Sequence, residues 1–270
     1  MDVAYGSLPR PTRELEHGYG PNVHILGHPY LLTLLAQLCA DGTIQPRVNR
    51  LISTLYAWLL GAVAGTEFPR RRSAVPTRMV HATPKGVFEG ELLDPEVKVI
   101  TCAIARAGIL PSQVCYEMLN DLMNPHLVRQ DHIFMNRVAD ASGKITGVNL
   151  TGSKIGGPVN HAILLVPDPM GATASTLIGL AEHYLKHPDG APARMIAMHL
   201  IVTPEYLKRI TLSHPDLAIW AIRLDRGLSP PDVLAKPLGA DWDRERGLDE
   251  KGYIVPGGGG FGEVLNNALL

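Results

Sequence analysis

The feature that most constrains the fold of this chain is a series of uninterrupted apolar runs of strand length, separated by segments with helical spacing. The runs are VKVITCAIA (97–105), HIFMNRV (132–138), AILLV (162–166), MIAMHLIV (195–202) and LAIWAIRLD (217–225). Strands that are apolar on both faces are typical of a parallel sheet covered by helices on both sides. We therefore predict an α/β fold with a mainly parallel sheet flanked by helices, in which ligands bind at the carboxyl ends of the strands.

Helical periodicity appears before and between these runs. Two segments, 29–41 and 46–65, predict a helical flank within residues 29–68. Further helices are predicted at 112–123, 175–186 and 204–214, each between two strands. Residues 144–159 are interpreted as a hood excursion over the sheet edge.

The remaining segments complete a single predicted domain. Residues 1–28 are expected to form an N-terminal arm, 97–228 the α/β core, 229–246 a surface insertion and 247–270 a C-terminal base-binding segment. The stretch PRRRSAVPTR (69–78) is bounded by prolines and strongly basic. For PRRRS (69–73), a charged loop is the favoured interpretation, and a site for an anionic effector is the alternative.

Composition excludes several classes of protein. The chain has 270 residues, of which 46% are hydrophobic, so it can bury a large core. A formal net charge of −1 argues against binding nucleic acid or an acidic membrane surface. The longest uncharged apolar run, residues 51–66, is too short to span a bilayer and predicts a buried helix. Three cysteines within apolar stretches, Cys39, Cys102 and Cys115, favour a reducing, cytoplasmic location.

The stretch AILLVPDPMGATASTL (162–177) holds the first candidate site. Asp168 follows a buried strand, where its carboxylate can accept hydrogen bonds from vicinal hydroxyls. Thr173, Ser175 and Thr176 stand at the start of a predicted helix, and helix amides with nearby hydroxyls suit a phosphate. A plain helix N-cap is an equally good explanation from the pattern alone.

Two more segments are candidates for ligand contacts. In ARAG (105–108), Arg106 ends a strand beside small residues, which suits a second anion such as pyrophosphate, although a surface arginine is the commoner explanation. Glycines at 257–260 and 262 would be costly in a core element, so the tail either approaches a ligand closely or is floppy. Eight residues after GGGGFG leave no room for a dinucleotide fold.

Several motifs occur in one order that resembles a known family. They are CAIARAGIL, HIFMNR, VPDPMGAT, VTPE, SHPD, LDRGL and GLDEKGYIVPG, spread over residues 97–262, and HPYLLTLLAQL near the start is similar too. Their combination resembles the uracil phosphoribosyltransferases, a branch of the type I phosphoribosyltransferases. The resemblance implies transfer of ribose 5-phosphate from phosphoribosyl pyrophosphate to uracil, giving UMP and pyrophosphate. It also implies Mg²⁺ on the pyrophosphate, small-molecule substrates and a homo-oligomer.

The resemblance assigns roles to individual residues. Asp168 would hold the ribose hydroxyls, 172–176 would wrap the 5-phosphate, and Arg106 and Arg137 would contact pyrophosphate. The full set implied for phosphoribosyl pyrophosphate is Arg106, Arg137, Asp168, Pro169, Met170, Gly171, Ala172, Thr173, Ala174, Ser175, Thr176 and Gly260, with Arg106, Arg137 and Asp168 as the catalytic candidates. The set implied for the base is Ile254, Gly259, Gly260 and Phe261.

The chain also departs from the family pattern. Ala174 and Ser175 replace two glycines of the phosphate loop, and a positive φ at either would cost about 1 kcal/mol. Gly260 replaces an aspartate, and Phe261 replaces an alanine beside the base. Two alternatives therefore stay open: a nucleotide-binding or assembly subunit with weak or no turnover, and a transferase for a different base.

Overall fold

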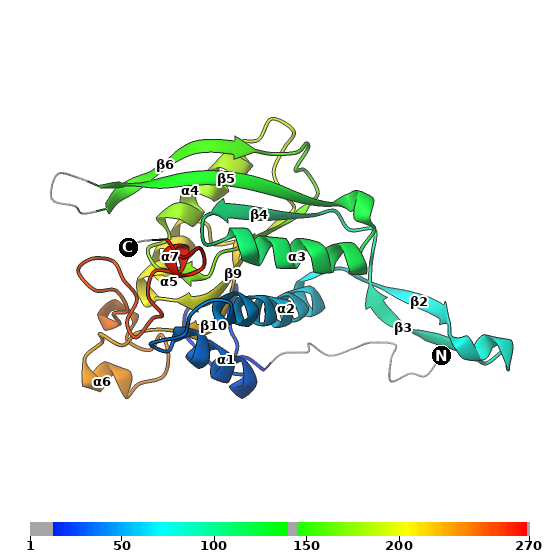
Figure 1. Ribbon diagram of the computed structural model, residues 1–270, viewed down its shortest axis with the longest axis horizontal. Coiled ribbons are helices and arrows are strands. Elements are labelled where there is room, and N and C mark those ends of the chain that lie inside the picture. Colours follow the sequence, from blue (N-terminus) through cyan, green and yellow to red (C-terminus); the bar gives the residue numbers. More distant parts are fainter. Residues whose placement is uncertain (1–12, 140–144, 269–270) are drawn as a thin grey trace.

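The computed structural model describes residues 13–139 and 145–268, with the backbone alone described at 136–139 and 145–148 (Figure 1). Its elements in chain order are β1 (Val23–Ile25), α1 (Pro29–Cys39), α2 (Arg47–Glu67), β2 (Arg70–Pro76), the 3₁₀ turn η2 (Arg78–His81), β3 (Val87–Leu93), β4 (Val99–Ala105), α3 (Ile109–Leu122), η3 (Pro125–Leu127), β5 (Val128–Ala139), β6 (Ile145–Lys154), β7 (Ile163–Pro167), β8 (Met170–Gly171), α4 (Ser175–Leu185), β9 (Arg194–Val202), α5 (Pro204–Ser213), β10 (Ala218–Leu224), α6 (Pro231–Leu234), η4 (Trp242–Arg244) and α7 (Phe261–Val264).

The main sheet has the strand order β1-β10-β9-β7-β4-β5-β6, and the short β8 pairs with β9. All neighbours are parallel except β5 and β6, which form an antiparallel pair at one edge. The predicted parallel α/β fold is therefore confirmed. Because β4, β7 and β9 run side by side in one direction, the segments that follow Ala105, Pro167 and Val202 meet at the same end of the sheet.

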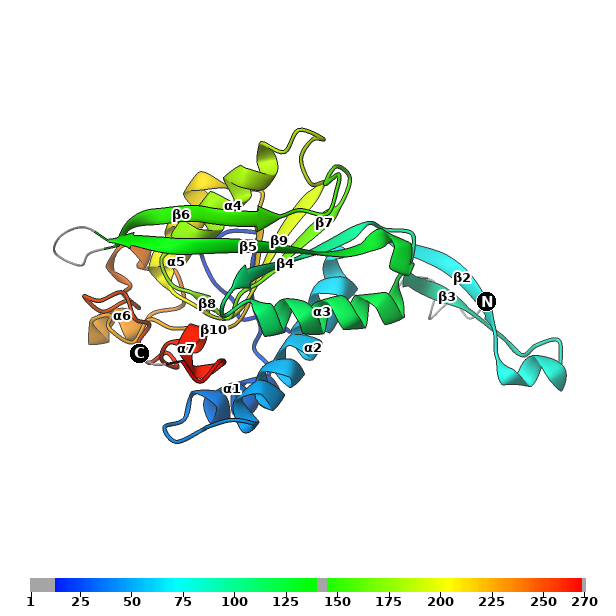
Figure 2. The same ribbon diagram turned by 45° about the horizontal axis from the view of Figure 1, so that its top comes forward.

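Helices cover both faces of this sheet (Figure 2). Helices α1, α2 and α3 enclose one apolar core, whereas α4 and α5 enclose the other. Neighbouring residues of β7, Leu164 and Leu165, belong to different cores because successive side chains of a strand point to opposite faces. The continuous apolar runs follow from this double burial.

The predicted helical flank is present as α1 and α2. The run 51–66 lies within α2, whose leucines pack on the sheet, so the prediction of a buried helix is confirmed. Across residues 13–139 and 145–268, none of the helices combines the length and apolar character that crossing a membrane requires.

One sequence prediction at a sheet edge was wrong. The described part of the N-terminal arm adds β1 parallel to β10, with Val23 and Ile25 buried, so this part is a sheet edge rather than a surface arm. His24 on β1 stacks on Trp220 of β10, with ring centroids 4.3 Å apart. Trp220 belongs to the apolar core that α2 covers. The predicted hood excursion contains the strand β6, which pairs antiparallel with β5 in a register that shifts at two points.

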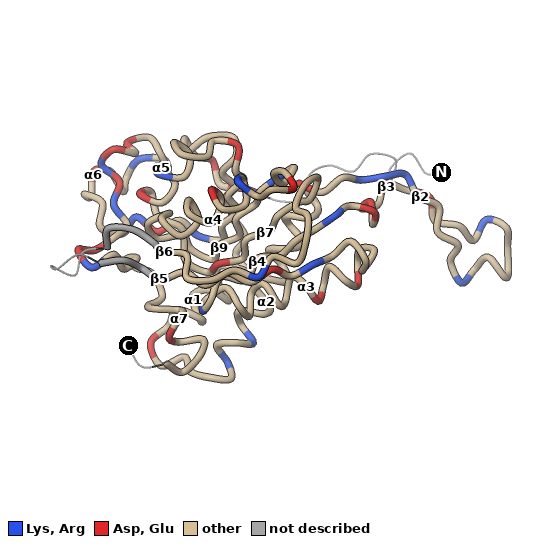
Figure 3. Tube along the Cα trace, turned by 90° about the horizontal axis from the view of Figure 1, so that it is seen from above, with Lys and Arg blue, Asp and Glu red and all other residues tan. Residues whose placement is uncertain are grey.

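The basic stretch 69–78 is a strand and not a charged loop. It forms β2, which pairs with β3 into an antiparallel hairpin that projects from the rest of the molecule (Figures 1 and 2). Its arginines lie along β2 (Figure 3), and Arg70 and Arg71 pair with Glu91 and Asp94 at 3.2 and 3.4 Å. These cross-strand ion pairs explain why a run of like charges is compatible with a hairpin.

The segment 229–246 lies at the surface, yet it is tied to the core by Glu245. The Glu245 carboxylate is buried and accepts hydrogen bonds from the Tyr19 hydroxyl and from Arg226 Nη1, both at 2.5 Å, and from the Gly239 amide at 2.9 Å. Val233 of α6 is also fully buried. The insertion is thus a folded part of the domain.

Candidate active site

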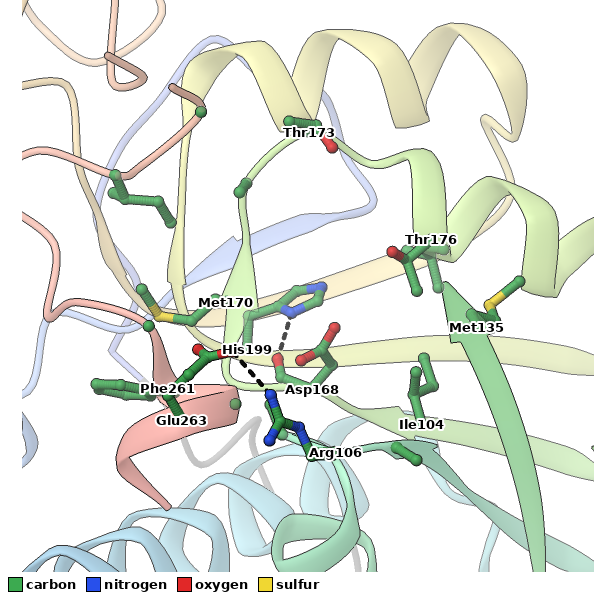
Figure 4. Close-up of a pocket in the computed structure, with 18 of the residues that line it drawn as sticks. Ile104, Arg106, Met135, Asp168, Met170, Thr173, Thr176, His199, Phe261 and Glu263 are labelled. Carbon is green, nitrogen blue, oxygen red and sulfur yellow. Dashed lines mark hydrogen bonds and ion pairs between the residues drawn. The ribbon is translucent and has the colours of Figure 1, made fainter. Parts of the chain in front are cut away.

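A cavity of about 1000 Å³ opens at the carboxyl ends of β4, β7 and β9 (Figure 4). Eleven of the residues predicted from sequence line it: Arg106, Asp168, Met170, Ala172, Thr173, Ala174, Thr176, Ile254, Gly259, Gly260 and Phe261. Arg106 and Asp168, 62 positions apart in the sequence, therefore face one space. The structure brings the candidate anion, sugar and base contacts together.

The other predicted residues are placed differently. Pro169 is buried, and its carbonyl accepts hydrogen bonds from the amides of Leu200 and Ile201. A Cβ at Gly171 would lie 2.9 Å from Val202 Cγ1, so this glycine serves close packing of the loop on β9. The backbone of Arg137 lies in β5 opposite Val148, and its side chain is outside the described part of the chain.

The main chain of Asp168 is held at both of its polar groups. Asp168 lies between Pro167 and Pro169, neither of which has an N–H. Its own N–H donates to the Met198 carbonyl at 3.0 Å, and its carbonyl accepts a hydrogen bond from His199 Nδ1 at 2.6 Å. The strand end is thereby fixed while the Asp168 side chain lines the cavity (Figure 4).

The loop 172–176 leads directly into α4. Ala174 occupies the N-cap position and no side chain caps the helix, so the interpretation of this stretch as a plain Ser/Thr N-cap was wrong. Thr173 and Thr176 line the cavity, whereas the Ser175 hydroxyl accepts a hydrogen bond from Arg209 Nη1 at 3.0 Å. The free amides at the start of an 11-residue helix, beside two threonines, form a good environment for a phosphate.

Ala174 has a φ of +63°, so one of the two replaced loop glycines stands at a left-handed position. Ala174→Gly should stabilise the protein by about 0.5 kcal/mol, since relief of left-handed strain exceeds the added entropy of the unfolded chain. Urea unfolding measures this. The matched control is Ala181→Gly in the middle of α4, which should destabilise by about 1 kcal/mol or more. Loss of stability in both variants would contradict the strain.

Arg106 follows β4 and lines the cavity with a half-exposed side chain. Its Nη2 lies 2.9 Å from Oε1 of Glu263, which belongs to α7 (Figure 4). The sequence analysis did not predict this pair. The ion pair links the segment after β4 to α7, and both of its residues line the cavity.

The glycine-rich tail is folded, so its interpretation as a floppy tail was wrong. Asp225 Oδ2 accepts a hydrogen bond from the Gly257 amide at 2.8 Å, and Arg223 Nη2 donates to the Gly257 carbonyl at 3.0 Å. Arg223 and Asp225 are themselves joined by two hydrogen bonds of 2.6 and 2.7 Å. Gly257 and Gly259 have φ of +59° and +79°, which explains the glycines at these turns.

Phe261 does not crowd the cavity. Its side chain is 2% exposed and belongs to the apolar core on the α1–α3 side. A Cβ at Gly258 would lie 2.9 Å from Phe261 Cε1, so the ring and the glycine pack closely. Figure 4 shows the ring turned away from Arg106 and Asp168. The aromatic residue therefore anchors α7.

Sequence reasoning missed several cavity residues, among them His199 and Tyr206. His199 Nε2 lies 2.5 Å from the Tyr206 hydroxyl, and both side chains are about 2% exposed. Burial lowers the pKa of His199 to about 4, although the hydrogen bond to the Asp168 carbonyl opposes this shift. The signal in the sequence was a histidine within an otherwise apolar strand, MIAMHLIV, which is more often a satisfied core residue.

The lowered pKa of His199 predicts a loss of stability in acid. Between pH 6.5 and about 4 the unfolded chain binds a proton at this residue that the folded chain does not, so stability falls as the pH falls through this window. The loss is on the order of 3 kcal/mol. Urea unfolding of wild type and His199→Asn from pH 4 to 7 isolates it, because the wild type should lose more. An equal loss of unfolding free energy in wild type and His199→Asn over this pH range would contradict the prediction.

Two further candidates from the sequence lie outside the cavity. Lys154, at the end of β6, is exposed and does not line it. His183 and His187 lie four positions apart, a spacing that suits a metal in a helix, although a solvated helix end is the commoner explanation. Within the described ranges, no three His, Cys, Asp or Glu residues gather as a metal site.

The parallel sheet with its antiparallel edge pair, and the loop 168–176 at its carboxyl end, define a type I phosphoribosyltransferase fold. The structure of the AQ2163 protein from Aquifex aeolicus has the same fold, with a TM-score of 0.68 and 21% identity over 90% of this chain and 97% of that one. The family model described as uracil phosphoribosyltransferase matches residues 25–245. The chain belongs to the uracil phosphoribosyltransferase family, and it is a transferase enzyme.

Curated relatives match most of the chain at low identity. A uracil phosphoribosyltransferase of Campylobacter jejuni is 24% identical over 256 residues, which cover 92% of this chain and 99% of the relative. A uracil phosphoribosyltransferase of Thermococcus sibiricus is 27% identical over 230 residues, which cover 84% and 90%.

Proposed function

We propose that this enzyme transfers ribose 5-phosphate from phosphoribosyl pyrophosphate to uracil, giving UMP and pyrophosphate. The observation that carries the proposal is the shared cavity of Arg106, Asp168 and the loop 172–176, with the C-terminal backbone facing them. A sugar phosphate and a small planar base both fit a cavity of about 1000 Å³. The family membership supports the transferase chemistry, and uracil is the base named for the relatives.

Each lining group has a role in this proposal. The Asp168 carboxylate accepts hydrogen bonds from the two ribose hydroxyls, and the amides and threonines at the start of α4 bind the 5-phosphate. Arg106 exchanges its contact with Glu263 for the pyrophosphate. The backbone at Ile254 and Gly259–Phe261 offers donors and acceptors to the edge of the base. Arg137 is proposed as a second pyrophosphate contact.

The reaction develops positive charge on the ribose C1 as pyrophosphate leaves. Cations that stabilise the departing pyrophosphate lower this barrier, and Arg106 supplies one of them. Mg²⁺ fits the same place, since Asp168 offers carboxylate oxygens and the pyrophosphate brings more, the ligand type that this ion prefers. When bound, the ion would neutralise the charge of the leaving group.

The direct test mixes the purified enzyme with phosphoribosyl pyrophosphate, Mg²⁺ and labelled uracil and measures UMP and pyrophosphate. We expect both products in equal amounts, and neither without Mg²⁺. A folded protein that binds phosphoribosyl pyrophosphate yet yields no UMP would overturn uracil as the substrate. A screen of other pyrimidines and purines then identifies the base.

A second candidate function is a nucleotide-binding protein with weak turnover. The Arg106–Glu263 ion pair favours it, because the pair occupies the arginine that the pyrophosphate needs. Calorimetry discriminates the two functions: UMP binding without product formation supports the second. Turnover with uracil at ordinary enzyme rates excludes it.

We also propose that the enzyme is a homo-oligomer joined through the β2–β3 hairpin. The hairpin exposes apolar side chains on a projecting element, among them Val75, Met79 and Phe88. Light scattering should give a mass of at least two chains, and Met79→Ser with Phe88→Ser should shift it to one chain. A single-chain mass for the wild type contradicts the proposal. The cytoplasmic location stays a prediction from the cysteines.

A further inference from the structure

A buried histidine and tyrosine lie behind the aspartate of the proposed sugar site. His199 is on β9 and Tyr206 is on α5, seven positions later, and both line the cavity while remaining almost fully buried. His199 contacts the Asp168 carbonyl with one ring nitrogen and the Tyr206 hydroxyl with the other. Nothing in the proposed reaction uses either side chain directly.

The hydrogen-bond partners determine which ring nitrogen carries the proton. A backbone carbonyl can only accept, so Nδ1 must donate to the Asp168 carbonyl at 2.6 Å. A neutral imidazole then has an unprotonated Nε2, which accepts from the Tyr206 hydroxyl at 2.5 Å. Burial keeps the ring neutral, since it lowers the pKa of His199 to about 4. Both nitrogens are satisfied in one tautomer only.

The local sequence explains why the Asp168 carbonyl needs this donor. In VPDPM, the prolines at 167 and 169 remove the neighbouring amides, and the strand leaves the regular ladder at this point. The Asp168 amide is held by Met198, the residue before His199. Residues 198 and 199 of β9 therefore fix both sides of the Asp168 peptide, and hence the direction in which its carboxylate leaves the backbone.

We infer that His199 and Tyr206 are positioning residues for Asp168: the Tyr206 hydroxyl donates to Nε2 and fixes the orientation of the His199 ring, and the Nδ1–H of this ring fixes the aspartate for the ribose hydroxyls. The inference rests on the proposed function for its kinetic consequence. It requires no contact between His199 and the substrate. Its effect falls on the binding of phosphoribosyl pyrophosphate and not on the base.

The first measurement is ¹⁵N NMR of the histidine-labelled full chain, with His199→Asn used to assign the resonance. We expect an Nδ1–H, Nε2-unprotonated ring throughout pH 5.5 to 8. Tyr206→Phe should keep this tautomer but shift the Nε2 resonance, because the unprotonated nitrogen loses its hydrogen-bond donor. An Nε2–H tautomer in the wild type, or an unchanged spectrum in Tyr206→Phe, would overturn the inference whatever the enzyme's substrate is.

The second measurement is steady-state kinetics with calorimetry of phosphoribosyl pyrophosphate and Mg²⁺. His199→Leu removes the donor at similar volume and should raise the KM for phosphoribosyl pyrophosphate about tenfold, leaving the KM for the base unchanged. His199→Asn keeps an N–H near the position of Nδ1 and should restore most of this loss. Equal KM values in wild type and His199→Leu, or equal damage in both variants, would overturn the inference.

Controls separate positioning from folding and from the proposed function. Tyr184→Phe removes another buried hydroxyl, which donates a hydrogen bond of 3.0 Å to Asp131. Neither residue lines the cavity, so this variant should lower stability without changing either KM. If the wild type fails to bind phosphoribosyl pyrophosphate, the proposed function is overturned. The inference about His199 is then still tested by the NMR measurement. Should His199→Leu fail to fold, Tyr206→Phe carries the kinetic test with the same expected direction.

Discussion

Asp168→Asn should lower kcat/KM for phosphoribosyl pyrophosphate on the order of 100-fold while shifting the melting temperature by less than about 3 °C. The carboxylate lines the cavity, and in the proposed complex it accepts two hydrogen bonds from ribose hydroxyls. Asparagine keeps one oxygen acceptor, loses the charge and places a donor where an acceptor is required. The backbone anchors at Met198 and His199 do not depend on the side chain, so folding should be preserved.

Steady-state kinetics and thermal unfolding together check this expectation. Asp243→Asn is the matched control, because that carboxylate is exposed and pairs with Lys208 outside the cavity. It should leave both quantities unchanged. A large loss of melting temperature in Asp168→Asn with unchanged affinity would mean that the aspartate is structural and would remove the main support for the sugar site.

Asp225→Ala should destabilise the protein by about 3–5 kcal/mol, the largest stability effect that we expect from a single substitution here. The Asp225 side chain is 2% exposed and joins Arg223 to the Gly257 amide. Its removal leaves a largely buried arginine without its carboxylate and frees the amide that begins the glycine turn. Because this turn carries residues 259–261, the KM for the base should also rise.

Asp232→Ala provides a matched control for this prediction. Asp232 and Arg244 also make two hydrogen bonds, of 2.8 and 3.0 Å, but both side chains are about half exposed. Solvent screening weakens such a pair, so Asp232→Ala should destabilise the protein far less than Asp225→Ala. Urea unfolding of both variants compares buried and exposed versions of the same interaction. Similar losses of unfolding free energy in the two variants would show that burial does not determine the strength of the Asp225–Arg223 interaction.

The parallel core was predictable because its signal is local. Runs such as AILLV and MIAMHLIV are apolar on both faces, and only a sheet covered on both sides buries them. The hairpin 70–93 was missed because its like charges are balanced by acids about twenty positions away, on the partner strand. The edge strand β1 was missed because three residues carry too little periodicity to predict a strand.

The candidate site was predictable to the extent that its residues follow strands. Arg106 and Asp168 each come directly after an apolar run, and parallel pairing brings strand ends together. Ser175 was assigned to the cavity but turns to Arg209, because side-chain direction at a helix start depends on neighbours from another element. Phe261 was assigned to the base, yet its ring packs into the core beside Gly258.

The sequence by itself determined the class of fold, the edge of the sheet where ligands bind, and the resemblance that named the chemistry. Local periodicity and motif order are sufficient for these, since each depends on residues close together in the chain. Tertiary structure alone decided that His199 stands behind Asp168, that Asp225 holds the glycine tail and that Glu263 meets Arg106. These contacts join residues from different elements, and no local pattern records which of them a fold brings within hydrogen-bond distance.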